Sequence, residues 1–531
     1  MVIKIVLMIV FIAVIISIGI MERRHARSVD GYILGGRNVG PWLSAFAFGT
    51  SYFSAVIFIG YAGQFGWKFG VAATWIGIGN AVIGSLLAWW ILGSRTREMT
   101  QRLKASTMPE FLGLRFNSKA IRIAAALIIF VFMIPYTASV YNGLSRLFEM
   151  AFGIPYEFCI IGMAVVTCIY VVVGGYMATV MNDFVQGIIM LIGIIAVIAA
   201  VLNGAGGFSE AILDLSHIEA EGTTLSGAFV SFFGPAPLDL LSVIILTSLG
   251  TWGLPQMVTK FYAIKQGPAI KQGAIISTIF AIVVAGGSYF LGGFGRLFGD
   301  SVAMNANGTP VYDSIIPTML SSLPDILVGI VVVLVLSASM STLSSLVLTS
   351  SSTLTLDLVD KNFVKDGLNE KSKVKWMRAF VIVFVAISAA LALLQYNSSI
   401  NFIAQLMGIS WGALAGAFLG PFFWGLFSGR ISKAAVWASF IFAVGLTTSN
   451  MVFGFIGSPI VAGAIAIVAS LIIVPIVSLV TPAVPFDIKP PQQLGAIDRE
   501  YLHELEEEEL AEEAAESTAT QVQADISATM S

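Results

Sequence analysis

Hydroxyl side chains gather in the middle of one long apolar stretch, where they could bind a small cation. Ser341, Ser344 and Ser345 are spaced three and four residues apart, so on a helix they share one face, and Thr342 lies beside it. Hard cations take oxygen ligands, and hydroxyl groups can supply them. The same hydroxyls could instead bond to carbonyl groups one turn earlier in their own helix and bind nothing else.

A carboxylate lies in another apolar stretch. Asp183 belongs to the sequence ATVMNDFVQG and falls a few residues inside the start of a predicted span. A lone carboxylate at that place is costly unless it is paired, solvated at the membrane interface or bound to an ion. The sequence places no Lys or Arg at the same depth. We therefore favour a cation site that joins Asp183 to the serine face over solvation of Asp183 at the interface.

Two apolar stretches contain residues that favour a broken helix. The first reads SAFAFGTSYFSAV, with small and hydroxyl residues at 49–54, and the second reads LTSLGTWGLPQM, with glycine, threonine and proline at 247–255. Small residues can also serve helix packing. Irregular backbone inside a membrane survives only where it lines a cavity, and a pair of such breaks is typical of transporters that bind their substrate there. We expect both helices to unwind at these positions.

The elements that would position these residues are membrane-spanning helices. The chain has 531 residues, of which 57% are hydrophobic and 11% charged, whereas soluble domains carry about 25% charged residues. Lipid must therefore cover much of its surface. Apolar runs of about 20 residues predict thirteen spans, at 2–20, 41–66, 71–93, 122–150, 156–174, 178–203, 238–260, 272–298, 325–357, 376–396, 400–427, 433–455 and 459–481.

The basic residues of the loops predict the orientation. If the N-terminus lies outside, the inner loops collect most of the Lys and Arg residues, including the clusters within 95–122 and 361–378. Positive residues favour the cytoplasmic side. We therefore expect a multi-pass protein of the inner cell membrane, with the N-terminus outside and the C-terminus inside. The basic cluster at 23–27 follows the first apolar run, which indicates a retained helix rather than a signal peptide.

Several function classes lack support in the sequence. The chain has no Walker A loop, no dinucleotide-binding glycine motif and no nucleophile elbow, and its three histidines and two cysteines form no metal-ligand pattern. We therefore expect no enzymatic activity, no organic cofactor and no nucleic-acid partner.

Six stretches of the sequence, taken together, form a pattern specific enough to indicate a protein family. They are GYILGGRNVGPW (31–42), TSYFSAVIFIG (50–60), GLSRLFE (143–149), GGYMATVMNDFVQG (174–187), GLPQ (253–256) and SASMSTLSSL (337–346). Together they resemble the sodium/solute symporter family over about residues 30–480. The resemblance implies an all-α membrane protein with a LeuT-type inverted repeat of five plus five helices. The implied segments are an additional N-terminal helix at 1–25, the first repeat and an outer loop at 26–237, the second repeat at 238–430, two further helices at 431–482 and an acidic cytoplasmic tail at 483–531.

The resemblance also implies Na⁺ as the coupling ion and assigns its ligands. A first sodium site would use backbone carbonyls and two hydroxyls, from Thr50, Phe53, Ala338, Ser341 and Thr342. A second sodium site, which some members of the family have, would use one carboxylate and three serines, from Asp183, Ser341, Ser344 and Ser345.

The substrate-binding residues of the family match this sequence less completely than the sodium ligands do. Tyr52 stands where the proline symporter has an acidic residue, and two threonines stand where it has aromatic residues. The sequence is closest in look to the pantothenate permease branch, which favours a pantothenate-like or other small carboxylate. An amino acid or a sugar is the alternative within the family. The residues that fall at the substrate position are Ser54, Tyr136, Thr247, Thr251, Trp252 and Pro255.

These features predict a secondary active transporter that imports a small solute together with sodium by alternating access. Two other functions stay open. The same fold could report a solute to a partner as a membrane sensor, and sodium-dependent accumulation would distinguish the two. Coupling to protons through Asp183 is the second alternative, and replacing sodium with choline at fixed pH would test it.

Overall fold

The computed structural model of the chain describes residues 2–22, 28–220, 226–305, 308–321, 323–362, 364, 367–396 and 403–486. The basic cluster at 23–27 and nearly all of the predicted acidic tail at 483–531 lie outside these residues.

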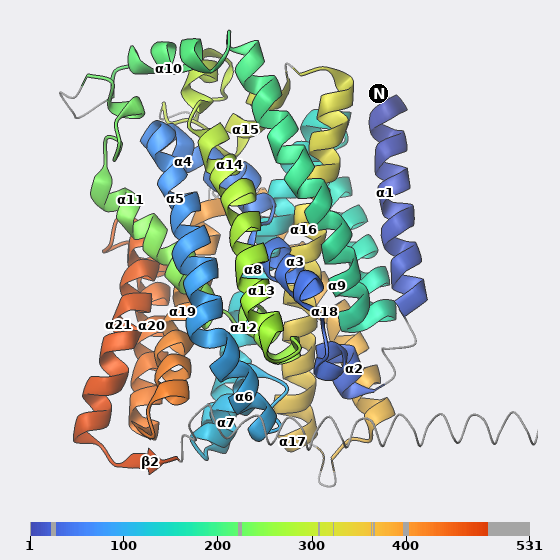
Figure 1. Cartoon of the computed structure of the whole chain (residues 1–531), viewed down its shortest axis with the longest axis vertical. Coiled ribbons are helices and arrows are strands. Elements are labelled where there is room, and N and C mark those ends of the chain that lie inside the picture. The colour runs from blue at the N-terminus through green and yellow to red at the C-terminus, as the bar shows by residue number, and fades with distance from the viewer. Residues whose placement is uncertain are drawn as a thin grey trace, which may run out of the picture. The chain divides into compact units, whose positions relative to one another are not determined.

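Most of the described residues are helical, with short 3-10 and π turns (η) inside or between the helices (Figure 1). The N-terminal part contains α1 (Val2–Met21), α2 (Val29–Leu34), η2 (Gly35–Arg37), α3 (Pro41–Tyr52), η3 (Val56–Tyr61), α4 (Ala62–Phe69), η4 (Gly70–Ala73), α5 (Thr74–Gly79), η5 (Asn80–Gly93), α6 (Ser94–Arg102), α7 (Met108–Arg115), α8 (Lys119–Phe152), α9 (Tyr156–Gly204) and α10 (Phe208–Ser216). The remainder contains η6 (Ala228–Val230), α11 (Pro237–Ile244), η7 (Ile245–Leu249), η8 (Gly250–Gly253), α12 (Pro255–Ala263), α13 (Pro268–Ala281), η9 (Ile282–Gly286), α14 (Gly287–Gly292), η10 (Gly295–Ser301), η11 (Tyr312–Ser314), α15 (Ile315–Ser321), α16 (Asp325–Thr353), η12 (Leu354–Val359), α17 (Asp360–Asn362), α18 (Glu370–Tyr396), α19 (Ile403–Phe427), β1 (Arg430–Ser432), α20 (Lys433–Phe453), α21 (Pro459–Val480) and β2 (Ala483–Pro485).

Ten helical segments of the described residues are long and apolar enough to cross a membrane, or eleven if one bent pair counts as a span. Thirteen spans are predicted from the sequence, and the difference has two causes. Two predicted spans fall within α9, which Gly175 (φ 60°) divides by leaving the helical conformation. The predicted span 41–66 is broken after Tyr52, so its second part continues into the segment Val56–Arg102.

Both predicted helix breaks are present. The helix α3 ends at Tyr52, where Phe53 turns to an extended conformation (φ −110°, ψ 97°), and η3 starts at Val56. The segments Pro237–Gly253 and Pro255–Ala263 meet at an angle of 46°, because Leu254 between them is extended (φ −81°, ψ 121°). The glycine, threonine and proline content of these stretches therefore predicts the interruptions correctly.

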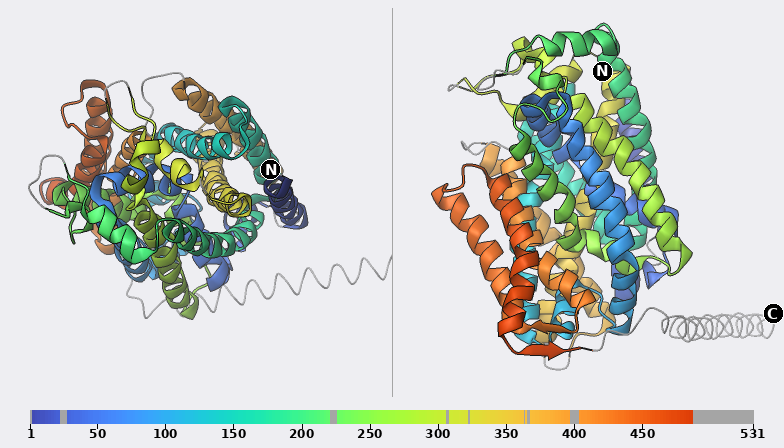
Figure 2. Two further views of the ribbon diagram at one scale, coloured as in Figure 1. Left: turned by 90° about the horizontal axis from the view of Figure 1, so that it is seen from above. Right: turned by 60° about the vertical axis from the view of Figure 1, so that its left-hand side comes forward.

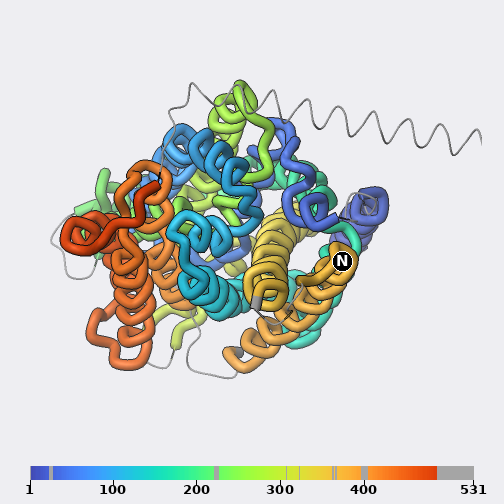
Figure 3. Tube along the Cα trace, turned by 90° about the horizontal axis from the view of Figure 1, so that it is seen from below, coloured from blue at the N-terminus to red at the C-terminus, as the bar shows by residue number. Residues whose placement is uncertain are grey.

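The helix α16, which carries the serine face, lies inside the bundle. It packs against α9, α8, α1, α18 and α3, and these neighbours surround it when the bundle is seen along the helices (Figures 2 and 3). In its most apolar window 78% of the residues are buried, against 17% in α1. The hydroxyl groups of α16 are therefore positioned in the interior, whereas α1 exposes most of its apolar surface, as a lipid-facing helix would.

The C-terminal part adds a group of three helices, since α19, α20 and α21 pack closely against one another. Two three-residue strands close this group, with β1 antiparallel to β2 and Ile431 opposite Val484. The strands are not predicted from the sequence, because three residues are too few to produce a detectable alternation. Within the bundle, α19 also contacts α8 and η8, so it reaches the second helix break.

Candidate ion and substrate site

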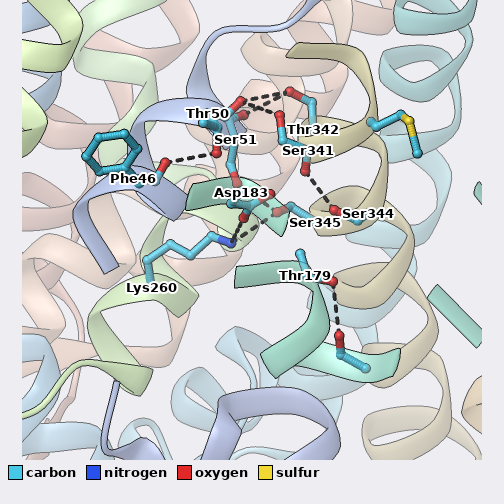
Figure 4. A network of polar contacts seen from close by, with 12 residues as sticks. Phe46, Thr50, Ser51, Thr179, Asp183, Lys260, Ser341, Thr342, Ser344 and Ser345 are labelled. Carbon is cyan, nitrogen blue, oxygen red and sulfur yellow. Dashed lines mark hydrogen bonds and ion pairs between the residues drawn. The ribbon is translucent and has the colours of Figure 1, made fainter. Parts of the chain in front are cut away.

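The hydroxyl groups of α16 meet the broken end of α3. The Ser341 Oγ donates to the carbonyl oxygen of Thr50 at 3.0 Å or of Ala338 at 3.1 Å. The Thr342 Oγ1 lies 3.3 Å from the Thr50 carbonyl oxygen, 3.1 Å from that of Ala338 and 3.4 Å from that of Ser51. Figure 4 shows these groups facing one another across the two helices. The structure therefore brings together four of the five residues that the resemblance assigns to the first sodium site.

The fifth residue, Phe53, is buried and lies just beyond the end of α3. Its amide donates to the Gly49 carbonyl, which is the last such bond of α3, and its own extended backbone leaves the helix. The Thr50 carbonyl is free to accept from α16 because the helical ladder stops here. The break and the hydroxyl cluster thus form one arrangement, in which neutral oxygen atoms from two helices converge.

The serines of α16 differ in their hydrogen-bond partners. Ser339 donates to the Val335 carbonyl of its own helix at 2.6 Å, and Ser344 donates to the Ser341 carbonyl at 2.9 Å. These two hydroxyls behave as ordinary polar groups that bond back to their helix. Ser341, in contrast, can donate across to α3. The expected serine face is therefore only partly directed at the helix break.

Asp183 is fully buried and has a cationic neighbour. The Lys260 Nζ lies 3.7 Å from Asp183 Oδ2, and the two side chains are 2% and 1% exposed. The expectation that the sequence places no Lys or Arg at this depth is therefore wrong. The burial of Asp183 also argues against the alternative in which it is solvated at the interface. Lys260 is the last residue of the predicted span 238–260, at its cytoplasmic end, but α12 starts at Pro255 after the 46° bend and turns Lys260 into the bundle.

A chain of polar contacts links this ion pair to the broken helix. The ammonium group of Lys260 also donates to Ser345 Oγ at 3.1 Å, and Ser345 Oγ is 2.7 Å from Ser51 Oγ. Ser51 belongs to the unwinding end of α3, next to Thr50 (Figure 4). Of the four residues assigned to a second sodium site, Asp183 and Ser345 therefore contact the lysine, whereas Ser341 faces the Thr50 carbonyl.

The approach of α9 to α3 depends on a glycine. A methyl group at Gly187, one turn after Asp183, would lie 2.4 Å from Phe46 Cδ1 and 3.1 Å from Thr50 Cγ2. The missing side chain thus lets α9 pack directly against the part of α3 that carries Thr50. Gly187 is in one of the stretches that resemble the family, but its packing role could not be seen without the structure.

Several predicted substrate residues surround the second helix break. The Tyr52 hydroxyl donates to the Thr247 carbonyl at 2.6 Å, so it ties the first break to the second. Thr251 donates to the Gly84 or Ser248 carbonyl, at 3.1 Å and 2.8 Å.

The other four predicted substrate residues have these places. The indole nitrogen of Trp252 donates to the Ile83 carbonyl at 2.9 Å. Pro255 starts α12. The Ser54 hydroxyl accepts from the Val56 amide at 3.2 Å and so caps the turn after the first break. Tyr136 from α8 faces Trp411, with ring centroids 5.9 Å apart.

Further polar groups that sequence reasoning missed lie next to these residues. Tyr289 interacts with Tyr52 and Asn80, and Trp411 packs 6.2 Å from the Tyr52 ring. All of these side chains are buried. Four polar atoms of this cluster make no hydrogen bond of ordinary geometry among the described residues, namely Asn80 Nδ2, Tyr136 Oη, Tyr289 Oη and Trp411 Nε1, although Asn80 lies next to Tyr289 and Tyr136 next to Trp411. Buried polar groups are normally paired, so this cluster of donors suits a polar ligand. The lone Asn80 in an apolar run is the one signal in the sequence that could have indicated it.

Comparisons with known proteins agree with the family resemblance found in the sequence. The profile of the Sodium:solute symporter family matches residues 32–442. The chain belongs to this family. The sodium/proline symporter of Salmonella typhimurium is 30% identical over 425 residues, which cover 78% of this chain and 80% of that protein. The sodium/pantothenate symporter of Escherichia coli is 28% identical over 447 residues, which cover 83% of this chain and 89% of that protein.

A solved structure shows the same fold. A Na⁺-coupled sialic acid symporter in its substrate-bound outward-open state aligns with a TM-score of 0.75, covering 91% of this chain and 99% of that one at 17% identity. The symporter described here is accordingly a multi-pass membrane protein of the LeuT-type fold. The family resemblance that the sequence motifs indicated is confirmed.

The symporter also has a small pocket on one side of the ion pair. It is lined by residues of α2, α7, α9, α12 and α16 and by the two residues before α7. Lys260 and Ser345 belong to its wall, as do Gln256 and Thr107. The buried ion pair of this symporter is therefore adjacent to a pocket whose wall also includes the start of α7.

Proposed function

We propose that this chain imports a small organic solute together with Na⁺ by alternating access, and that a small carboxylate of the pantothenate type is its substrate. Sodium-coupled symport follows from membership of the family, whose relatives are transporters. The observation that supports the ion site best is the contact of the Ser341 and Thr342 hydroxyls with the Thr50 carbonyl at the end of the broken α3. Neutral oxygens from two helices can hold a small cation and join those helices while it is bound.

The substrate proposal rests on the donors near the second break. Asn80, Tyr136, Tyr289 and Trp411 each carry a buried donor that makes no hydrogen bond of ordinary geometry. A carboxylate has only acceptors, so it can satisfy several of these donors at once. The predicted residues Ser54, Thr247, Thr251, Trp252 and Pro255 would line the same space. A zwitterionic amino acid is the second candidate, because a sodium/proline symporter is 30% identical to this chain.

The proposed topology has thirteen crossings, with the N-terminus outside and the C-terminus in the cytoplasm of the inner cell membrane. The two helix breaks would occupy equivalent positions in repeats at 26–237 and 238–430. In that orientation the pocket beside Lys260 would face the cytoplasm. The additional helix at 1–25, the helices at 431–482 and the tail at 483–531 would lie outside the repeats.

The test is transport by the purified chain in proteoliposomes. Radiolabelled pantothenate, proline and a sugar are offered with an inward gradient of Na⁺, K⁺ or choline at fixed pH. We expect accumulation of pantothenate with the Na⁺ gradient alone. Accumulation driven equally well by a pH gradient without Na⁺ would contradict sodium coupling. Sodium-dependent stabilisation of the protein by a solute that is never accumulated would support the sensor instead.

A further inference from the structure

The groups around the Lys260 side chain are those that stabilise a buried positive charge. Its ammonium group lies 3.7 Å from Asp183 Oδ2, donates to Ser345 Oγ at 3.1 Å and is 5.3 Å from the centre of the Tyr176 ring. An ammonium group over an aromatic face is attracted by the ring electrons. The side chain is only 2% exposed. A carboxylate, a hydroxyl and an aromatic ring thus meet one buried positive charge.

The position of Lys260 conflicts with a second sodium ion. The family resemblance assigns such an ion to Asp183, Ser341, Ser344 and Ser345, and the ammonium group already contacts two of them. The other two are directed elsewhere, since Ser344 donates to a carbonyl of its own helix and Ser341 to that of Thr50 or Ala338. A sodium ion at Asp183 would also face a like charge at close range in a medium of low dielectric constant, where repulsion is strong. The residues present therefore do not fit a second Na⁺ while Lys260 is in place.

We propose that the ammonium group of Lys260 takes the place of the second sodium ion, so that this symporter binds one Na⁺, at Thr50, Ala338, Ser341 and Thr342. The inference rests on the proposed sodium coupling and sharpens its stoichiometry. A lysine is tethered to α12 and is not released with the solute. It balances the charge of Asp183 and ties the segment after the second helix break to α9 and α16, but it carries no charge through the membrane. Lys260 is thus a positioning residue that determines how many ions are coupled.

The test is equilibrium binding of radioactive Na⁺, as the sole ligand, to the purified full chain. We expect about one bound ion for the wild type. Lys260→Gln replaces the ammonium group with a neutral amide on a shorter side chain, so it should create a second site and raise the count to about two. Lys260→Arg is the matched control and should stay at about one. Lys260→Gln combined with Asp183→Asn should return the count to about one, because the new site loses its carboxylate.

The outcomes separate this inference from the sodium coupling itself. No saturable Na⁺ binding by the wild type would contradict the proposed function. Two bound ions in the wild type, or one in a folded Lys260→Gln variant, would contradict only the role of Lys260. If Lys260→Gln does not fold, Ser345→Ala in the otherwise wild-type chain provides the test of the proposal. It should leave the count at about one ion and the affinity within about twofold, whereas loss of that ion would overturn the proposal.

Discussion

At the scale of single residues, similar side chains have different roles because their neighbours differ. Ser341 and Ser339 both belong to α16, yet Ser341 reaches the Thr50 carbonyl and Ser339 bonds to its own helix. Spacing alone groups the serines but does not distinguish these roles. The partner of Asp183 also escapes sequence reasoning, because Lys260 enters the bundle only through the bend before α12.

The buried ion pair gives a prediction for stability. Asp183→Asn leaves the ammonium group of Lys260 buried beside a neutral amide. Removing one partner of a buried pair typically costs about 3–5 kcal/mol, so the melting temperature of the purified protein should fall clearly. The double variant Asp183→Asn, Lys260→Gln should recover most of the loss, since no unpaired charge is left. Equal stability of Asp183→Asn and wild type would show that the pair is not formed.

At the scale of elements, the proposed sodium site depends on how closely three helices approach one another. The contact of α9 with α3 requires a residue without a side chain at Gly187, and α16 packs against both of these helices. The breaks in α3 and before α12 are predictable because glycine, threonine and proline mark them locally. The contacts across them are not, since Asn80, Tyr289 and Trp411 come from segments far apart in the chain.

Gly187→Ala tests this packing. The added methyl group would press on Phe46 and Thr50, so we expect a lower melting temperature and weaker Na⁺ binding, by at least about tenfold if the Thr50 carbonyl shifts out of reach of α16. The matched control is Gly162→Ala on the same helix, where nothing lies within 4 Å of the added atom. That exposed change should be neutral or stabilise by up to about 1 kcal/mol. The same Na⁺ affinity in both variants would contradict the packing role.

A second element-scale prediction concerns Asp313 in η11, outside the membrane-spanning segments. Its carboxylate accepts from the Ile403 amide at the start of α19, and burial raises its pKa from 3.8 to about 7. Because the folded state then binds the proton more tightly than the unfolded state, this group favours folding below about pH 4 and progressively loses that contribution as the pH rises to about 7. The melting temperature of the wild type should therefore fall between pH 5 and pH 8.

The variant Asp313→Asn should lack the part of this pH dependence that Asp313 causes, because an amide does not titrate in this range. The amide oxygen can still accept the hydrogen bond from the Ile403 amide. Asp239→Asn is the control, since Asp239 belongs to an exposed pair with Lys68 and such pairs contribute little. We expect the control to keep the pH profile of the wild type. A wild-type profile in Asp313→Asn as well would contradict the assignment.

At the scale of the whole molecule, the bundle is a transporter whose apolar composition and motifs predict its class and family. The count of spans is less predictable, because α9 and the segment around α3 change direction within runs that are apolar throughout. The proposed number of coupled ions depends on one residue, Lys260, which the hydropathy pattern places at the very end of a span.

The number of coupled Na⁺ ions determines how strongly the membrane potential drives uptake. One Na⁺ moving inward gains about 2.3 kcal/mol per 100 mV, and a monoanionic solute moving with it returns about the same amount. Uptake of a pantothenate-like anion should therefore follow the Na⁺ gradient and respond little to an imposed membrane potential, whereas a zwitterion would accumulate about 50-fold more per 100 mV. Proteoliposomes with a potassium diffusion potential measure this. Strongly potential-driven uptake of a monoanion would indicate two sodium ions.

The most direct test of the central claim is the Na⁺ dependence of uptake in Ser341→Ala compared with Ser339→Ala. Both changes remove one hydroxyl from α16, but only Ser341 contacts the broken α3. Loss of a ligand to a charged group costs about 1.5–3 kcal/mol, so Ser341→Ala should raise the Na⁺ concentration for half-maximal uptake at least about tenfold. Ser339→Ala should stay within about twofold of the wild type. Equal Na⁺ dependence in the two variants would contradict a sodium site at this helix break.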